Sequence, residues 1–265
     1  MNPTPLDADW LNQHRRPHLP DVVVSPSLPS TNDAIKAQWA NNEPGTIWLA
    51  DEQTQGRGRR GRTWLSPPGG GLYLSMPHQS EHRQDTLPAF GLVLALAVAK
   101  AVPDPVWVKW PNDIVTTQDR GWAKVGGCLI DVSISPGAPV GLILGVGLNL
   151  ALQAHLGSAP HAPPDQAWAD LAHVTDRNAL ALNLIHQLDD DLRVFEAEGL
   201  APFFARWDAL DILKGQTIAV LENDHPIMEG VAVGINALGQ LGVEANGATE
   251  WLNHGDVSIR PSQRL

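Results

Sequence analysis

Two apolar runs, AKVGGCLIDVSI at residues 123–134 and VGLILGVGLNL at residues 140–150, decide the fold class. Both consist mainly of Val, Ile, Leu and Gly, and a short Pro- and Gly-containing segment separates them. Continuous apolar runs of this length, bounded by turn residues, are typical of strands that are buried on both faces of a sheet. The sequence therefore predicts that both runs are strands of a buried β-sheet.

The flanking sequence predicts further strands around these two. Strands are expected at residues 45–50, 71–76 and 106–109, where short apolar segments are bounded by Gly, Pro or Asp. Residues 51–71 are rich in Gly, Arg and Pro and predict a long loop between the first two of these strands.

Three helices are expected along the chain. Ser30 and Asp33 have the spacing of a capping box, so a helix is expected to begin there. Residues 86–102 form an apolar helix that is shorter than the roughly 20 residues needed to span a membrane and contains Lys100. Leucines recur with helical spacing over residues 180–195, and Gly199 supplies the end of that helix.

The two ends of the chain differ from this central part. Residues 1–29 contain six prolines and little apolar periodicity, which predicts an extended arm. Short strand-like segments separated by Asn, Asp and Gly follow residue 215, at residues 217–221, 226–233, 240–244, 248–252 and 256–260. They predict a small β-barrel or β-sandwich. We therefore expect an α+β protein with an arm at 1–29, a mixed α/β domain at 30–210 and an all-β domain at 211–265.

Composition narrows the class of function. The chain has 265 residues, a formal net charge of -11, 18 Lys plus Arg, and one cysteine. Acidic composition argues against a nucleic-acid binder, because phosphate contacts need a basic face. One cysteine excludes an intramolecular disulfide framework. No apolar signal segment follows the N-terminus, so we expect a cytoplasmic protein.

The loop Gln55-Gly-Arg-Gly-Arg-Arg-Gly-Arg62 concentrates the scarce positive charge. It contains the dinucleotide pattern G-x-G-x-x-G, but that pattern must open a helix, and Pro67, Pro68 and three glycines follow here instead. Glycines permit close backbone approach, and guanidinium groups pair with phosphate or carboxylate. The loop is thus interpreted as an anion site that is mobile when empty, while a solvated basic turn and a nucleic-acid patch remain alternatives.

Three further clusters could carry chemistry. In Lys109-Trp-Pro-Asn112-Asp113, a cation and two oxygen-bearing side chains at a strand end could hold a nucleotide phosphate and Mg²⁺, although an ordinary Asn-Asp turn explains them equally well. In Lys124-Val-Gly-Gly, paired glycines within a strand indicate a bulge or a close approach to a ligand. In Gly145-Val-Gly-Leu-Asn149, the Asn either contacts a ligand or caps a turn.

Other chemistry has weaker support. His78-Gln-Ser-Glu-His82 matches a metalloprotease string, but it lies in a polar stretch and not on an apolar-faced helix. Cys128 lies within an apolar run and is interpreted as a small core residue.

Taken together and in this order, the clusters resemble those of the biotin protein ligases. The resemblance runs from Ser30-Thr31-Asn32 and Gln53 through the Arg loop, Lys-Trp-Pro-Asn-Asp, Lys-x-Gly-Gly-x-Leu-x-Asp and Gly-x-Gly-x-Asn to the C-terminus. It implies a class II synthetase-like catalytic domain followed by a small SH3-like β-barrel. It also implies a two-step ligase: biotin is converted by ATP and Mg²⁺ to biotinyl-5′-adenylate, and biotin is then transferred to a lysine of a biotin carboxyl carrier protein, such as that of acetyl-CoA carboxylase.

The resemblance also implies roles for particular residues. Lys124, Arg57 and Arg59 would be catalytic, and Asp113 would bind the metal. The biotin site would comprise Ser30, Thr31, Asn32, Gln53, Arg57, Gly58, Arg59 and Lys124. The ATP site would comprise Arg59, Arg60, Arg62, Trp64, Lys109, Asn112, Asp113, Asn149 and Trp168.

The chain departs from the family pattern at two points. Repressor members carry an N-terminal winged helix-turn-helix, and only 29 residues precede Ser30, so we expect a monofunctional ligase without DNA binding or a membrane role. Asp131 stands where the family usually has Glu. A homodimer is compatible with exposed strands. The rivals are a lipoate-protein ligase, against which the Arg loop and the Lys109–Asp113 motif argue, and a non-catalytic nucleic-acid module.

Overall fold

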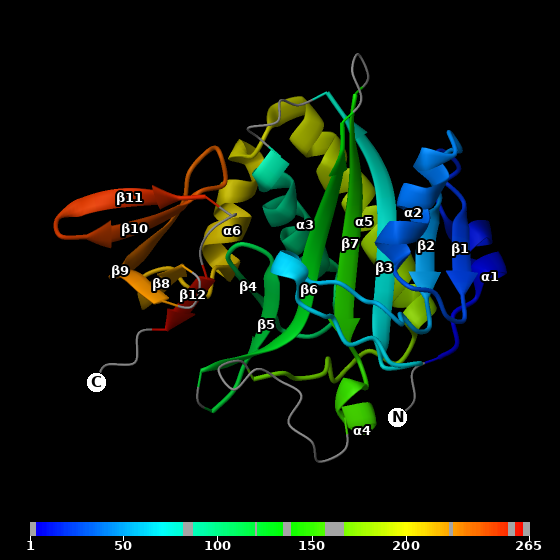
Figure 1. Ribbon diagram of the computed structural model, residues 1–265, viewed down its shortest axis with the longest axis horizontal. Helices are drawn as coiled ribbons and strands as arrows, with labels where there is room; N and C mark the ends of the chain where they lie inside the picture. The colour runs from blue at the N-terminus through cyan, green and yellow to red at the C-terminus, as the bar shows by residue number, and fades with distance from the viewer. Residues whose placement is uncertain are drawn as a thin grey trace.

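A seven-stranded mixed sheet forms the centre of the protein (Figure 1). The computed structural model describes residues 4–81, 87–119, 121–134, 139–156, 167–222, 225–253 and 258–261. The strand order is β1-β2-β3-β7-β6-β5-β4, with β1 parallel to β2 and every other pair antiparallel. The strands are β1 Val22–Ser25, β2 Ile47–Ala50, β3 Gly71–Ser80, β4 Trp107–Lys109, β5 Asp113–Thr117, β6 Trp122–Ser133 and β7 Val140–Asn149.

The two apolar runs that predicted buried strands are β6 and β7, and they lie side by side in the centre of the sheet. Side chains at even positions of β7, such as Leu144 and Leu148, are fully buried in the core. Of the odd positions, Gly141, Gly145 and Gly147 lack a side chain, whereas Ile143 and Asn149 have one. This pattern makes one face of the sheet the core face and leaves the middle of the other face, around Gly145 and Gly147, bare.

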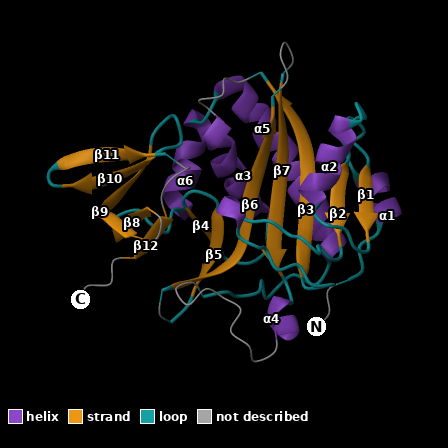
Figure 2. Cartoon of the chain, viewed as in Figure 1, coloured by secondary structure: helices purple, strands orange, loops and turns teal. Residues whose placement is uncertain are grey.

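Helices cover the two faces unequally (Figure 2). The apolar helix α3 Leu87–Ala101 and the long helix α5 Arg177–Glu198 pack against each other and against the core face. Asp176 caps α5 by accepting from the backbone N–H groups of Asn178 and Ala179, and Gly199, with φ of 69°, ends it. The bare face receives one helix, α2 Thr31–Ala40, which contacts β2, β3 and β7. Shorter helices are α1 Ala8–His14, α4 Leu152–Leu156 and α6 Phe204–Leu210.

The expectation of an extended arm at residues 1–29 is wrong. Helix α1 is capped by Asp7, which accepts from Trp10 N at 2.9 Å, and it buries Leu11 completely. Strand β1 pairs with β2 in parallel, with Val22 opposite Ile47. The prolines lie before, between and after these two elements and interrupt neither of them. Both elements are too short for a periodicity signal and are stabilised by packing on the domain.

The C-terminal strands form a separate antiparallel sheet. Its order is β11-β10-β9-β8-β12, and its strands are β8 Thr217–Glu222, β9 His225–Ile235, β10 Leu241–Ala245, β11 Ala248–Leu252 and β12 Ser258–Pro261. The mixed sheet with packed helices and a small all-β unit are therefore confirmed. Within the described ranges the edge strands β11 and β12 do not pair, so these strands do not close into a barrel.

The C-terminal sheet is anchored to the larger one by buried contacts. The indole of Trp110 is fully buried and donates to Gly239 O at 3.0 Å. Ile212 N donates to Val108 O at 3.0 Å, which extends the edge of the larger sheet across the expected boundary. The division near residue 210 stays a prediction. In the part of the chain that the structure describes, no helix is long and apolar enough to cross a membrane.

Candidate functional site

The bare face of the large sheet has a floor of glycines. Tyr73, Gly147, Gly127 and Asp113 are directly opposite one another across β3, β7, β6 and β5. A Cβ added at Gly147 would lie 2.6 Å from the indole Nε1 of Trp64, and neither a methyl group nor a larger side chain would fit there. The glycines are therefore needed because other groups of the site approach the backbone directly.

Polar side chains gather where α2 meets this floor. Ser75 Oγ of β3 lies 2.6 Å from Thr31 Oγ1 and 2.5 Å from Asn32 Oδ1, and all three residues are buried. Gln53 Oε1 accepts from Thr31 N at 2.9 Å, and Gln53 Nε2 donates to Ser66 Oγ at 3.0 Å. Together they form a neutral network rich in donors and acceptors, which suits a small polar ring with carbonyl and N–H groups.

Ser30 occupies the N-cap position of α2, where the capping-box spacing placed it. Its side chain makes no capping hydrogen bond, and the residue is buried beside the network of Thr31 and Asn32. The helix start is thus confirmed, whereas the capping contact that predicted it is absent.

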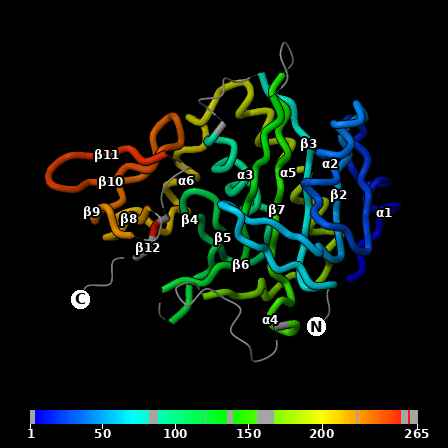
Figure 3. The backbone as a smooth tube through the Cα atoms, in the orientation of Figure 1, coloured from blue at the N-terminus to red at the C-terminus, as the bar shows by residue number. Residues whose placement is uncertain are grey.

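The Arg loop folds over the floor as a narrow hairpin. Arg57 forms an antiparallel bridge with Thr63, and Gly58 N donates to Arg62 O at 2.7 Å. The turn at its tip, η1 Arg59–Gly61, places Arg60 at φ of 56°. Figure 3 shows this part of the chain crossing in front of β6 and β7. The hairpin brings Trp64 onto Gly147, where the buried Nε1 of Trp64 has no partner in the described structure.

An outer ion cluster lies beside the neutral network. We define it as Asp33, Lys36, Arg57 and Asp131. Arg57 contacts Asp33 Oδ1 at 2.6 Å and Asp131 Oδ2 at 3.0 Å, and Lys36 Nζ contacts the same Asp131 oxygen at 2.9 Å. Burial opposes ionisation of Asp131, but Lys36 and Asn32 hold its pKa below the usual range. Although Asp131 is shorter than the Glu usual in the family, its carboxylate contacts both α2, through Lys36, and the Arg loop, through Arg57.

An inner ion cluster lies at the other end of the floor. We define it as Lys109, Asp113, Lys124 and Arg59. Lys124 Nζ is paired with Asp113 Oδ1, and Lys109 Nζ lies 3.7 Å from Asp113 Oδ2. Although burial opposes it, Lys124 and Lys109 hold the pKa of Asp113 below its usual range. Lys124 also lies over the Trp64 ring, 5.3 Å from its centre.

Arg59 joins the loop to this inner cluster. Its guanidinium donates to Asn112 Oδ1 at 3.3 Å, and burial lowers its pKa. Three cations therefore surround one carboxylate, which gives the inner cluster a net positive charge. Such a site attracts a phosphate or carboxylate group.

The two asparagines expected in the ATP site, Asn112 and Asn149, donate hydrogen bonds to backbone carbonyl groups. Asn112 Nδ2 donates to Cys128 O at 2.5 Å, which fixes the end of β5 to β6. Asn149 Nδ2 lies 3.4 Å from Lys124 O and 3.2 Å from Ala169 O. Trp168 forms an isolated parallel β-bridge with Lys124 and so lies alongside the start of β6. These residues position the strand that carries Lys124.

The structure thus brings together most of the residues expected to form the site. The inner cluster contains Arg59, Lys109, Asp113 and Lys124, and the outer cluster contains Arg57. Arg60 and Arg62 are exposed at the hairpin turn. Sequence reasoning missed Ser75, Asp33 and Lys36, because their roles depend on how α2 packs across β3 and β7.

Two other expectations concern reactive groups. Burial raises the pKa of the Cys128 thiol, which fits a core residue and no nucleophile. His78 Nε2 lies 2.8 Å from Glu196 of α5, on the opposite side of the sheet from the inner cluster, while His82 lies outside the described residues. Among the described residues, no group of three His, Cys, Asp or Glu side chains could hold a metal ion.

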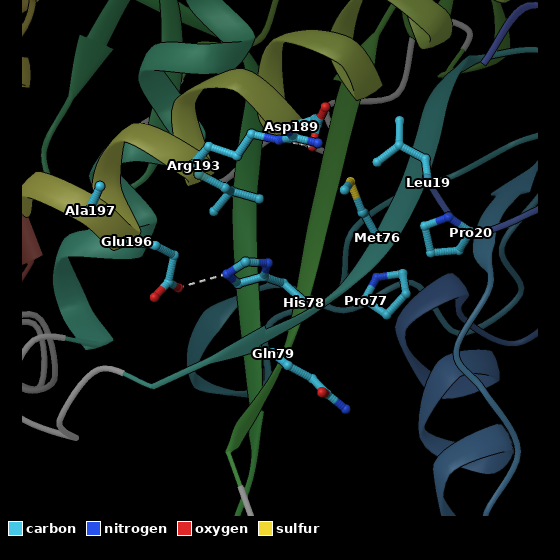
Figure 4. A pocket seen from close by; sticks show the side chains of 11 residues that line it. Leu19, Pro20, Met76, Pro77, His78, Gln79, Asp189, Arg193, Glu196 and Ala197 are labelled. Carbon is cyan, nitrogen blue, oxygen red and sulfur yellow. Dashed lines mark hydrogen bonds and ion pairs between the residues drawn. The ribbon is translucent and has the colours of Figure 1, made fainter. Parts of the chain in front are cut away.

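A hollow lies between α5 and β3, and Figure 4 shows its lining. Its volume is about 540 Å³, and Met76, Leu19 and Leu192 form part of its wall. None of the expected site residues lines it. The chemistry-bearing residues are therefore on the glycine face.

The fold and the site define a protein class that comparison with known proteins also identifies. The model of the biotin/lipoate A/B protein ligase family matches residues 24–149. The bifunctional ligase/repressor BirA of Escherichia coli is 33% identical over 250 residues, which cover 92% of this chain and 75% of that protein. The chain belongs to this family.

Two further relatives refine the class. A biotin–[acetyl-CoA-carboxylase] ligase of Paracoccus denitrificans is 33% identical over 189 residues, covering 68% of this chain and 70% of that protein. The structure of the biotin protein ligase from Aquifex aeolicus in complex with biotin and ATP superimposes with a TM-score of 0.70 at 26% identity, covering 91% of this chain and 99% of that one. The chain is thus similar in sequence and fold to biotin protein ligases, as the motifs predicted.

Proposed function

We propose that this protein is a biotin–[biotin carboxyl carrier protein] ligase. It uses ATP to convert biotin to biotinyl-5′-adenylate, and then transfers biotin to a lysine of a carboxylase carrier domain. The observation that carries this proposal is a single glycine-floored face with a neutral hydrogen-bonding network at one end and a net-positive cluster of buried cations at the other. Relatives named as ligases of biotin and acetyl-CoA carboxylase support it.

The neutral end suits the biotin ring system. Thr31, Asn32 and Gln53 present donors and acceptors that hydrogen bonds among themselves and to Ser75 hold in place, and the buried Ser30 lies beside them. A preorganised polar network of this kind selects a ligand by hydrogen-bond pattern rather than by charge. The carboxylate tail of biotin would then extend along the glycine floor towards Lys124.

The cationic end suits the chemistry of activation. The carboxylate of biotin attacks the α-phosphate of ATP, and pyrophosphate leaves with the electrons of the broken P–O bond. Two anions must be brought together, and charge grows on the transferring phosphate, so fixed cations supply most of the stabilisation. We assign Lys124 and Arg59 to this phosphate, and Arg57 and Gly58 to the closing loop.

The remaining residues would bind the rest of ATP, which is used as its Mg²⁺ complex. Lys109, Arg60 and Arg62 supply charge for the outer phosphates. Trp64 offers a buried N–H without a partner in the described structure, which an acceptor on the adenylate would satisfy. Asn112, Asn149 and Trp168 contribute by holding the backbone around Lys124.

Transfer to the carrier needs no nucleophile from the enzyme. The attacking group is the amine of the carrier lysine, which forms an amide with the biotinyl carbonyl and releases AMP. The inert environment of Cys128 agrees with this. We also propose a cytoplasmic location without a DNA or membrane partner. A homodimer is part of the same proposal, and sedimentation tests it.

Mass spectrometry of the carrier tests the proposed function. Purified protein is incubated with biotin, Mg²⁺-ATP and the biotin carrier domain of acetyl-CoA carboxylase. We expect the carrier to gain one biotinyl group only when biotin and ATP are both present. A carrier of unchanged mass, with enzyme that binds neither biotin nor ATP, would overturn the proposal.

A further inference from the structure

Asp113 is held in an unusual electrostatic environment for a residue expected to bind a metal. Its Oδ1 is paired with Lys124 Nζ, and its Oδ2 lies 3.7 Å from Lys109 Nζ. The charge of Arg59 also acts on it. The side chains of Asp113, Lys109 and Lys124 are 13%, 12% and 17% exposed. One carboxylate oxygen is therefore in direct contact with an ammonium group, and the other faces a second ammonium group at ion-pair distance.

These contacts do not fit a protein-held Mg²⁺ ion. Mg²⁺ requires a near-octahedral set of oxygen donors at close range and usually one or two carboxylates. The described residues offer no cluster of acidic side chains at this place. A divalent cation on Asp113 would also have to displace Lys124 and lie among the remaining positive charges, which repel it.

Strand geometry explains how Lys124 reaches Asp113. Asp113 is opposite Gly127, and the register between β5 and β6 shifts between Ile114 and Val115. The Lys124 side chain extends along its own strand, in the C-terminal direction, to lie against Gly127, where an added Cβ would be 3.2 Å from Lys124 Cε and 3.3 Å from Lys124 Nζ. Gly127 leaves room for the side chain, and Asp113 provides the charge at its end.

We infer that Asp113 is a positioning residue whose carboxylate fixes the ammonium group of Lys124, and that Mg²⁺ enters this site only as part of the ATP complex. This inference rests on the proposed function, in which Lys124 faces the reacting phosphate. Asp113 acts through Lys124 and supplies no ligand to the metal.

Thermal unfolding of the wild-type protein with Mg²⁺ alone gives the first test. A metal site in the free protein would raise the melting temperature as Mg²⁺ is added, because a ligand that binds only the folded state stabilises it. We expect no rise beyond that produced by an equal ionic strength of NaCl. A specific rise that the Asp113→Asn variant loses would overturn the inference.

Kinetics of Asp113→Asn give the second test. Misplacing a catalytic group by about 1 Å can cost about 10²-fold, so we expect kcat for biotin-dependent pyrophosphate release to fall by about that factor. The Mg²⁺ concentration for half-maximal rate, at fixed ATP, should stay within about twofold. A large increase in that concentration, with wild-type kcat restored at saturating Mg²⁺, would identify Asp113 as a metal ligand. Unchanged kcat would also contradict the inference.

Lys124→Gln and the double variant with Asp113→Asn separate an indirect role from a direct one. If Asp113 acts only through Lys124, the double variant should have the same kcat as Lys124→Gln within about twofold. A further loss of about tenfold or more would mean that Asp113 has an independent role.

The double variant also keeps the inference testable if Asp113→Asn alone fails to fold. Removing both members of the buried pair leaves no unpaired Lys124 charge, so it should melt at a higher temperature than the single Asn variant. If it melts lower, the pairing itself is wrong. If wild-type protein releases no pyrophosphate with biotin, the proposed function fails, but the Mg²⁺ melting experiment still decides whether Asp113 binds metal.

Discussion

The two ion clusters on the glycine face differ in how they are held. In the inner cluster, Lys124 and Asp113 come from adjacent strands and are both largely buried. In the outer cluster, Arg57 and Lys36 are 37% and 41% exposed and connect a loop and a helix to the end of β6. Exposed pairs contribute about 0–1 kcal/mol, whereas breaking a buried pair costs about 3–5 kcal/mol.

This difference indicates separate tasks. The inner cluster is fixed before any ligand arrives, which is what stabilisation of a developing phosphate charge requires. The outer cluster is weak enough to open, so that the Arg loop can admit biotin and close over it. Four predictions test this division, beginning with the largest effect.

Loss of the inner cation should have the largest effect. Lys124→Gln should lower kcat for biotin-dependent pyrophosphate release by about 10²–10³-fold, as removal of one fixed donor at a developing charge does. The matched control is Lys100→Gln, at an exposed lysine in the last turn of α3 on the core side of the sheet. Equal kcat values for Lys124→Gln and Lys100→Gln would contradict the catalytic task assigned to the inner cluster.

Filling the glycine floor should have the next largest effect. A Cβ at Gly147 would meet Trp64 Nε1 at 2.6 Å, so Gly147→Ala should displace the indole and cost about 1–3 kcal/mol of unfolding free energy. Biotin binding, measured by calorimetry, should weaken because Trp64 no longer packs on Gly147 and the Arg loop is displaced. Gly91→Ala, in α3 with no atom within 4 Å of the added Cβ, serves as the control and should not weaken it.

Asp211 is another buried carboxylate, and its pKa shifts in the opposite direction to that of Asp113, which lies among cations. Asp211 accepts from Trp207 Nε1 and Leu213 N, and burial raises its pKa to about 6. Its folded pKa lies above the unfolded value, so the stability it contributes is complete at low pH and is lost as the pH rises through about 6. The loss amounts to up to about 3 kcal/mol.

Melting curves from pH 4.5 to 7.5 measure this contribution. The stability of wild type relative to Asp211→Asn should decrease across that range. Asp9→Asn, which removes an exposed carboxylate from α1, is the control. A wild-type advantage that grows with pH would contradict the assignment, and would mean that Asp211 resembles Asp113.

Opening the outer cluster should have the smallest effect. Arg57→Gln should raise the KM for biotin by about tenfold with little change in kcat, because it removes binding made equally in ground and transition states. We further expect the 55–64 loop to become more sensitive to protease in high salt and less sensitive with biotin plus ATP, since exposed pairs are screened. Equal cleavage under all these conditions would show that the cluster does not hold the loop.

Much of this arrangement could be predicted from the sequence. The apolar runs of β6 and β7, the loop between β2 and β3, and the helix end at Gly199 all have local signals. The order of the motifs indicated the family before any geometry was known. The short elements α1, β1 and β5 were missed because each is stabilised mainly by its neighbours.

The contacts within the site could not be predicted in the same way. That Asp131 would bind Lys36 and Arg57, and that Ser75 would hold Asn32, follows from the packing of α2 over β3 and β7. Asp113 was expected to hold a metal because its type and motif suit one, yet its oxygens face ammonium groups. Residue type indicates what a side chain can bind, and only its neighbours decide what it does bind.

Isotope exchange between pyrophosphate and ATP tests the central claim most directly, because it reports formation of the adenylate without a carrier. We predict that the wild-type protein incorporates labelled pyrophosphate into ATP only when biotin is present, and that Lys124→Gln loses this exchange while Arg57→Gln recovers it at high biotin. Exchange that needs no biotin, or that persists undiminished in Lys124→Gln, would contradict the account.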